Sequence, residues 1–241
     1  MSNIDNADVV ILCGGLGKRL RPKIGEAQKV MAEVNQRPFL DLMLDRIQEQ
    51  GFRRVILCTG FQAQEVENYY QKNPRPLTFV FSREKEPLGT GGAVQYARPL
   101  IKSNPFLVLN GDCFCPIDFH AFLRFHRAKK ALASVAVSMM EDKKDFGSVL
   151  LNPSHKVVNF LEKNQESKAS HVNTGIYLFQ QDVFDHMPRE TKFSLEYDVF
   201  PGLTHQAFWA FVVPAKFFDI GTPERYAHVQ QIVGRKKGSI L

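Results

Sequence analysis

The feature that most constrains the fold is a regular alternation of short apolar runs and helical patterns over residues 1–130. The apolar runs are rich in Val, Ile, Leu and Phe and fit buried strands; they span residues 8–13, 54–59, 77–82 and 106–110. Apolar residues at helical spacing recur in residues 38–50, 63–71, 91–102 and 118–129. Strands that alternate with helices form βαβ units. The sequence therefore predicts an α/β fold with a Rossmann-like, mainly parallel sheet and helices on both faces.

The pattern changes after residue 131, where strand-like runs follow one another with fewer helices between them. These runs span residues 132–139, 147–151, 157–161, 173–179 and 208–213, and a helical pattern over 222–234 follows. No Pro-, Gly- or Ser-rich linker separates the two halves. We expect a single domain over residues 1–241 with a mixed sheet. One sub-region, over 1–130, would bind the nucleotide, and a second, over 131–241, would be an added lobe or an extension of the sheet that binds the sugar.

Composition and charge exclude several classes of partner. The hydrophobic fraction is 44%, and no apolar run approaches the roughly 18 residues of a membrane span. The net charge is +6, and the basic residues are scattered apart from two clusters, at residues 18–23 and 235–237; no nucleic-acid-binding motif accompanies them. The N-terminus has acidic residues before its apolar run and lacks a signal-peptide pattern. We expect a cytoplasmic protein that binds neither a membrane nor nucleic acid.

Residues 12–22, LCGGLGKRLRP, carry three glycines and three cations at the expected carboxyl end of the first strand, where α/β sheets bind ligands. A dinucleotide fingerprint needs a third spaced glycine that leads into a helix, and Pro22 disfavours a helix before it. A P-loop needs a hydroxyl residue where Arg19 stands. Both alternatives fail on these residues. The glycine N–H groups and the guanidinium of Arg19 instead suit phosphate oxygens in another kind of loop.

The stretch GGLGKRLRP (14–22) resembles the glycine loop of the nucleotidyltransferases that join a nucleoside triphosphate to a sugar 1-phosphate. Further segments resemble that family in its order: QKVM (28–31), PLGTGGAV (87–94), NGD (110–112), EK (162–163), NTGIYLF (173–179) and FFDIGTPERY (217–226). The resemblance covers nearly the whole chain and implies the nucleotide-diphospho-sugar transferase fold. One departure stands out, because the family has PKPM where Gln28 and Val30 flank Lys29 here.

The resemblance implies a role for each matched residue. The nucleotide would be bound by Leu12, Gly14, Gly15, Gly17, Lys18, Glu84, Gly89 and Thr90. The catalytic cations that hold the phosphates would be Arg19, Lys29 and Lys163. The sugar would be bound by Gly147, Glu162 and Asn173. Asp112 and Asp219 would hold Mg²⁺, a hard cation that prefers carboxylate, water and phosphate oxygens.

The implied reaction is attack by a sugar-phosphate oxygen on the α-phosphorus of the triphosphate, which yields a nucleotide-sugar and pyrophosphate. Glu84 stands where relatives that use UTP or dTTP commonly have glutamine. A carboxylate only accepts hydrogen bonds and so pairs with the two N–H donors of guanine, which favours GTP. The segments ILCGGLGKRL and FSREKEPLGTGGAV most resemble guanylyltransferases for D-glycero-α-D-manno-heptose 1-phosphate, and next those for mannose 1-phosphate. Such enzymes supply GDP-sugars for capsule and lipopolysaccharide synthesis.

Two alternatives stay open from the sequence alone. One is a uridylyl-, thymidylyl- or cytidylyltransferase that acts on another phosphorylated substrate. The other is a regulatory subunit that binds nucleotide-sugars without catalysis; the altered QKVM segment favours it, and the retained aspartates and cations oppose it. The sequence has no hexapeptide repeats, so we expect no additional domain with acyltransferase activity. A homo-oligomer is neither indicated nor excluded.

Overall fold

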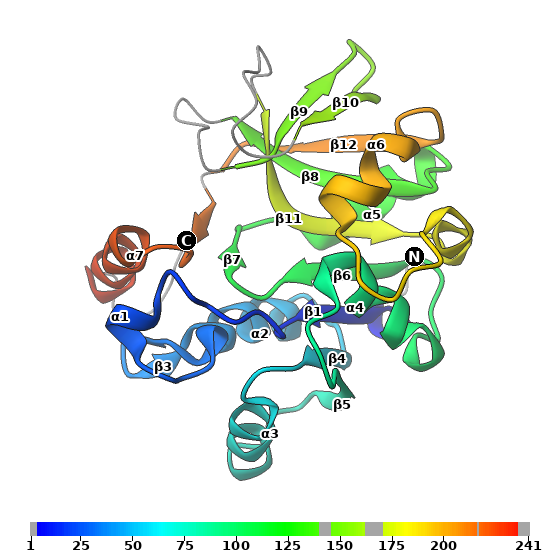
Figure 1. Cartoon of the computed structure of the whole chain (residues 1–241). Coiled ribbons are helices and arrows are strands. Elements are labelled where there is room, and N and C mark those ends of the chain that lie inside the picture. The colour runs from blue at the N-terminus through cyan, green and yellow to red at the C-terminus, as the bar shows by residue number, and fades with distance from the viewer. Residues whose placement is uncertain (1–3, 140–145, 162–170, 216, 236–241) are drawn as a thin grey trace.

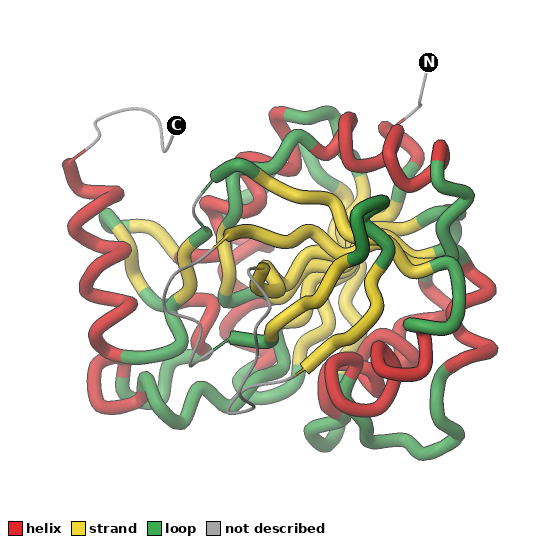
Figure 2. The backbone as a smooth tube through the Cα atoms, turned by 90° about the horizontal axis from the view of Figure 1, so that it is seen from above, coloured by secondary structure: helices red, strands yellow, loops and turns green. Residues whose placement is uncertain are grey.

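The computed structural model describes residues 4–139, 146–161, 171–215 and 217–235, and within them a twisted sheet of nine strands forms the centre of the molecule (Figures 1 and 2). Four strands of the first sub-region pair in parallel in the order β6-β1-β4-β5: β1 (Asp8–Leu12), β4 (Arg54–Thr59), β5 (Thr78–Arg83) and β6 (Phe106–Asn110). This is the predicted parallel core, and all four predicted strands are present.

The second sub-region extends the same sheet. Strand β11 (His171–Phe179) pairs antiparallel with β6, and so joins the two halves. The remaining strands follow from it: β8 (Ala133–Met139), β9 (Ser148–Leu151), β10 (Val157–Leu161) and β12 (Phe208–Val213). β8 and β9 pair antiparallel with β11, β10 pairs antiparallel with β9, and β12 pairs parallel with β8. The sheet is therefore mixed and mainly parallel in its first half, as the sequence predicts.

Helices cover both faces of the sheet, because alternate side chains of each strand point to opposite sides. Val9 and Ile11 of β1 belong to one apolar cluster and Val10 to the other. The first cluster is covered by α2 (Phe39–Glu49), α3 (Ala63–Lys72), α5 (Phe119–Ala128) and α7 (Pro223–Arg235). The second is covered by α4 (Gly89–Ala97), by the 3₁₀ turn Gln181–His186 (η4), by the π-helical turn Leu195–Val199 (η5) and by α6 (Phe200–Leu203).

Some elements differ from the expected pattern. The helix expected over 91–102 begins at Gly89 and ends at Ala97, where a 3₁₀ turn over Arg98–Leu100 (η3) follows. Pro99 lies in that turn, and its ring nitrogen has no hydrogen to donate to a helical carbonyl. Short elements that the apolar pattern does not reveal are η1 (Ile4–Asn6), α1 (Arg21–Ile24), η2 (Lys29–Met31), β2 (Glu33–Val34), β3 (Arg37–Pro38), β7 (Cys113–Phe114) and β13 (Phe218–Asp219).

Among the described residues no helix is both long enough and apolar enough to cross a membrane. The antiparallel pair of β7 and β13 matters more for function, because it brings together segments about a hundred residues apart. Asp219 lies opposite Cys113 in this pair, so the end of the chain returns to the carboxyl end of β6.

Candidate active site

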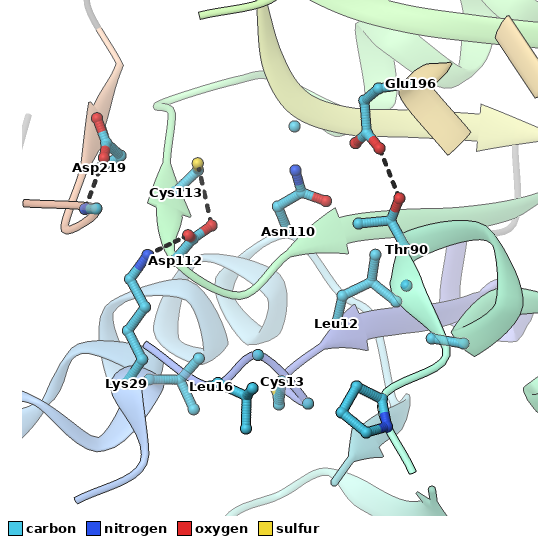
Figure 3. Close-up of a pocket in the computed structure, with 18 of the residues that line it drawn as sticks. Leu12, Cys13, Leu16, Lys29, Thr90, Asn110, Asp112, Cys113, Glu196 and Asp219 are labelled. Carbon is cyan, nitrogen blue, oxygen red and sulfur yellow. Dashed lines mark hydrogen bonds and ion pairs between the residues drawn. The ribbon is translucent and has the colours of Figure 1, made fainter. Parts of the chain in front are cut away.

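A cavity of about 490 Å³ opens at the carboxyl ends of β1 and β6 (Figure 3). This edge is where parallel α/β sheets bind ligands. The sequence-predicted residues that line it are Leu12, Gly14, Gly15, Arg19, Lys29, Glu84, Gly89, Thr90, Asp112, Gly147, Asn173 and Asp219. Segments spread over the chain are thus gathered around one space.

Four predicted residues are not placed there. Gly17 and Lys18 belong to the same loop but are not among the residues that line the cavity, and Lys18 is exposed. Glu162 and Lys163 lie outside the described residues. The contacts with substrate stay predictions for these four residues, as they do for the residues that line the cavity.

The three glycines of the first glycine loop, Gly14, Gly15 and Gly17, have different surroundings. A Cβ on Gly15 would meet no atom within 4 Å, so this backbone faces open space in the cavity wall. A Cβ on Gly14 would lie 3.0 Å from the carboxylate of Glu84. Gly17 has φ +58°, a left-handed conformation that other residues rarely adopt, and it backs onto the side chain of Lys29. The loop is therefore shaped by Glu84 on one side and Lys29 on the other.

Gln28 anchors the loop that carries Lys29. Its side-chain carboxamide is buried and donates from Nε2 to the carbonyl of Cys13, while its Oε1 accepts from the N–H of Val30 at 2.6 Å. Its own N–H donates to Oε2 of Glu65 on α3 at 2.8 Å. The backbone of Gln28 has φ −66° and ψ 134°, which is the conformation that proline favours. Hydrogen bonds thus fix here the backbone that a proline would fix by its ring.

Two carboxylates, Asp112 and Asp219, lie in the same part of the cavity. Asp112 follows β6, and its backbone carbonyl accepts from the N–H of Ile220 at 3.1 Å, directly beside Asp219. Nζ of Lys29 lies 2.5 Å from Oδ2 of Asp112. Burial raises the pKa of the Asp219 carboxyl, and the guanidinium of Arg225 at 3.2 Å and the N–H of Gly221 at 2.7 Å act in the opposite direction. The pair forms the acidic end of the cavity.

The chemistry of this pair fits a hard divalent cation. Carboxylate oxygens are ligands that Mg²⁺ prefers, and Mg²⁺ commonly takes one or two carboxylates with water and phosphate oxygens. The described residues contain no group of three or more His, Cys, Asp or Glu side chains that could hold a metal alone. Asp112 and Asp219 would therefore bind such a cation together with the phosphates of a ligand.

Glu84 lies next to the first glycine loop, at the other side of the cavity. The residue is buried, with 8% of its surface exposed, although it carries a charge at neutral pH in ordinary surroundings. Burial raises the pKa of its carboxyl, and the N–H of Leu88, which donates to Oε2 at 3.2 Å, lowers it. A buried carboxylate with few internal donors is a hydrogen-bond acceptor for a ligand that brings N–H groups.

The second glycine loop, PLGTGGAV (87–94), packs against a distant segment as well as facing the cavity. The N–H groups of Gly91 and Gly92 both donate to the carbonyl of Phe193, at 3.0 and 3.1 Å. A Cβ on Gly91 would lie 2.4 Å from the ring of Phe193, and one on Gly92 would lie 2.4 Å from the carbonyl oxygen of Thr191. These two glycines are required by residues 191–195, which cover the start of α4.

Sequence reasoning missed several residues that line the cavity. The principal polar ones are Gln28, Asn110, Glu196 and Arg225. Gln28 and Arg225 lie inside segments that the sequence singled out, QKVM and FFDIGTPERY, so their position was the available signal. Glu196 lies in a stretch without strand or helix periodicity, where no signal pointed to the cavity. Figure 3 shows Glu196 beside Thr90 on one side, and Asp112, Lys29 and Asp219 on the other.

Comparison with curated proteins gives relatives that match almost end to end. The chain is 32% identical over 225 residues to D-glycero-α-D-manno-heptose 1-phosphate guanylyltransferase of Aneurinibacillus thermoaerophilus, covering 93% of this chain and 97% of the relative. It is 35% identical to the protein of the same name from Campylobacter jejuni, covering 91% and 96%. Mannose-1-phosphate guanylyltransferase of Mycobacterium tuberculosis is 32% identical, and the match covers 91% of this chain but 62% of that longer relative.

Solved structures and the family pattern agree with these relatives. HddC from Yersinia pseudotuberculosis, which is also known as a complex with GMP-PN, superimposes with a TM-score of 0.83 at 33% identity, covering 93% of this chain and 98% of that one. A putative glucose-1-phosphate thymidylyltransferase from Bacillus anthracis shares the fold, with a TM-score of 0.86 at 19% identity. The nucleotidyl transferase pattern matches residues 8–236. The chain therefore belongs to the nucleotidyl transferase family, as the resemblance of its glycine loop and later segments predicted.

Proposed function

We propose that this protein transfers GMP from GTP to D-glycero-α-D-manno-heptose 1-phosphate and releases pyrophosphate and the GDP-sugar. The observation that carries the proposal is the cavity, where a glycine loop, the cations Arg19 and Lys29 and a pair of aspartates meet in a chain that spans 97% of a heptose 1-phosphate guanylyltransferase. Mannose 1-phosphate is the second candidate substrate, and the match to the mycobacterial mannose enzyme covers 62% of that protein.

The reaction needs alignment of two anions more than it needs proton transfer. An oxygen of the sugar phosphate forms a bond to the α-phosphorus, and the bond from that phosphorus to the bridging oxygen breaks, so pyrophosphate leaves with the electron pair. Because the attacking oxygen is already anionic, no general base is required. Arg19 and Lys29 would neutralise the triphosphate and hold the reacting atoms in line, and Lys163 would hold the sugar phosphate.

Asp112 and Asp219 are the residues that would hold Mg²⁺. The metal supplies charge neutralisation of the phosphate oxygens when it is bound. The two carboxylates also act on the protein's own cations, because Asp112 contacts Lys29 and Asp219 contacts Arg225. They would therefore set where these cations lie when the substrates arrive.

Release of pyrophosphate tests the proposed reaction directly. Purified protein with Mg²⁺ is given GTP, UTP, dTTP, CTP or ATP, each with heptose 1-phosphate or mannose 1-phosphate in separate reactions. The proposal expects release that depends on both GTP and heptose 1-phosphate. Greater turnover with mannose 1-phosphate would select the second candidate. Nucleotide-sugar binding without release under any condition would instead support a non-catalytic subunit.

Glu84→Gln is expected to weaken GTP binding by roughly tenfold and to leave UTP binding unchanged or stronger. The carboxylate accepts from both N–H donors of guanine, whereas a glutamine amide presents one acceptor and one donor. Calorimetric dissociation constants for GTP and UTP measure the change. Glu86→Gln, the same substitution at an exposed position of the same loop, is the matched control. An unchanged GTP-to-UTP ratio in the Glu84 variant would remove Glu84 from base recognition.

Gln28→Met is expected to lower kcat/KM by about tenfold and the free energy of unfolding by about 2 kcal/mol. The substitution keeps the side-chain volume but leaves the carbonyl of Cys13 and the N–H of Val30 without the partners they have here. The loop that carries Lys29 would then be held less firmly, and the ammonium of Lys29 would be less well positioned. Pyrophosphate release and urea denaturation measure the two effects, with Gln71→Met at an exposed position of α3 as control. Wild-type values for both quantities would show that the loop needs no such anchor.

A further inference from the structure

Glu196 is a carboxylate in the wall of the cavity that no step of the proposed reaction uses. It comes from η5, which lies over the sheet on the side of α4, and only 9% of its surface is exposed. A buried carboxylate is costly unless donors surround it. Three hydroxyl groups do so here, from Thr90, Ser194 and Tyr177.

The first two donors tie Glu196 to the second glycine loop. The Thr90 hydroxyl donates to Oε2 at 2.5 Å, and the Ser194 hydroxyl donates to the same oxygen at 2.8 Å. The oxygen of the Thr90 hydroxyl in turn accepts from the N–H of Leu195 at 2.9 Å. Glu196 is thus held at a fixed place relative to the start of α4.

The third donor leads to the proposed sugar site. The hydroxyl of Tyr177, a residue of β11, donates to Oε1 of Glu196 at 3.2 Å. The oxygen of that hydroxyl accepts from Nδ2 of Asn173 at 2.7 Å, on the same strand. Oδ1 of Asn173 accepts from the N–H of Gly175 at 2.9 Å. A continuous series of hydrogen bonds therefore runs from Thr90 of the second glycine loop through Glu196 to Asn173.

The donors of this series point one way, toward Glu196. Nδ2 of Asn173 donates to the Tyr177 hydroxyl, which donates in turn to Oε1 of Glu196. The Tyr177 hydroxyl on one side and the N–H of Gly175 on the other thus hold the amide with Nδ2 toward Tyr177 and Oδ1 toward Gly175. One N–H and one lone pair of this amide stay available to a ligand in the cavity, each with a defined direction.

We propose that Glu196 is a positioning residue for the sugar: acting through the Tyr177 hydroxyl, it sets the orientation in which Asn173 presents its amide to the sugar hydroxyls. The proposal rests on the proposed function, because it assigns the occupant of that part of the cavity to a sugar 1-phosphate. The two carboxylate oxygens have separate partners: Oε2 accepts from Thr90 and Ser194, and Oε1 accepts from Tyr177 on the strand that carries Asn173.

Two variants test the proposal without removing bulk. Tyr177→Phe deletes the hydroxyl that joins Glu196 to Asn173. Glu196→Gln replaces one of the two carboxylate oxygens by an NH₂ group, which cannot accept the hydrogen bond that a hydroxyl donates there. Each is expected to raise the KM for the sugar 1-phosphate on the order of tenfold and to leave kcat within about twofold. Tyr177→Phe, which leaves the bond between Thr90 and Glu196 in place, is also expected to leave the dissociation constant for GTP alone within about twofold. Tyr96→Phe, at an exposed tyrosine of α4, is the matched control and should match the wild type in all three.

The outcomes separate the proposal from the function on which it rests. Wild-type turnover with an unchanged sugar KM in both variants would overturn the positioning role and leave the proposed function intact. In Tyr177→Phe, a loss of GTP affinity equal to the loss of sugar affinity would also overturn it, because general loosening of the cavity would then explain both losses. If the unmodified protein turned over none of the sugar 1-phosphates, the proposed function would be overturned, and with it the positioning role.

Discussion

Asp112→Asn is expected to lower turnover by on the order of a thousandfold, equivalent to about 4 kcal/mol of transition-state stabilisation. The substitution keeps the size of the side chain and removes its charge. Asp112 would then bind Mg²⁺ weakly, and Lys29, whose ammonium lies 2.5 Å from the carboxylate, would lose its partner. Two contributions to phosphate alignment fail together, which is why the expected effect exceeds that of any other single change. Pyrophosphate release under saturating substrates measures it.

A matched control separates chemistry from folding. Asp118→Asn makes the same chemical change at the N-cap of α5, where asparagine caps a helix about as well as aspartate. We expect wild-type turnover in that variant and wild-type thermal stability in both. A turnover within tenfold of the wild type in the Asp112 variant would contradict the proposed metal site.

Gly89→Ala is expected to have the largest effect on stability, a loss of about 3 kcal/mol in the free energy of unfolding. Gly89 has φ +75°, where an L-residue is strained, and an added Cβ would lie 2.4 Å from the backbone oxygen of Phe193. Backbone cannot rotate away as the end of a side chain can, so residues 191–195 would have to shift. Urea denaturation followed by circular dichroism measures the loss.

Gly15→Ala is the matched control for Gly89→Ala, because it makes the same substitution where the added Cβ meets no protein atom. The new Cβ would meet no protein atom within 4 Å, so we expect an unchanged free energy of unfolding. The same Cβ would point into space that the proposal gives to the triphosphate, so GTP affinity should fall. Equal stability of the Gly89 and Gly15 variants would show that the second glycine loop is not held by residues 191–195.

Much of the fold could be predicted because its local signals agree with one another. Strands β1, β4 and β6 are buried on both faces and therefore read as continuous apolar runs. Gly51, with φ +97°, follows the end of α2, close to where the helical pattern over residues 38–50 ends. The pair of β7 and β13 escaped prediction, because two residues on each strand carry no periodicity and their pairing joins distant parts of the chain.

The candidate site divides in the same way. Arg19, Lys29, Asp112 and Asp219 could be named because each lies in a segment that resembles the family, and all four line the cavity. The partners that hold Lys29 could not be named, because the contact between Gln28 and Cys13 depends on how two loops fold against each other. Nor could Glu196, whose importance depends on hydroxyls from three separate segments.

The packing of residues 191–195 on the second glycine loop also bears on protein engineering. An engineer who wants to change the preferred base could exchange residues 87–94 between relatives. That exchange alone would bring in a loop whose shape fits the relative's own counterpart of residues 191–195. The carbonyl oxygens of Phe193 and Thr191 lie 2.4 Å from where a Cβ on Gly89 or Gly92 would be, and the ring of Phe193 lies equally close to one on Gly91. The two segments therefore have to be transplanted together. Substitutions in one should accordingly be accompanied by substitutions in the other as such enzymes diverge.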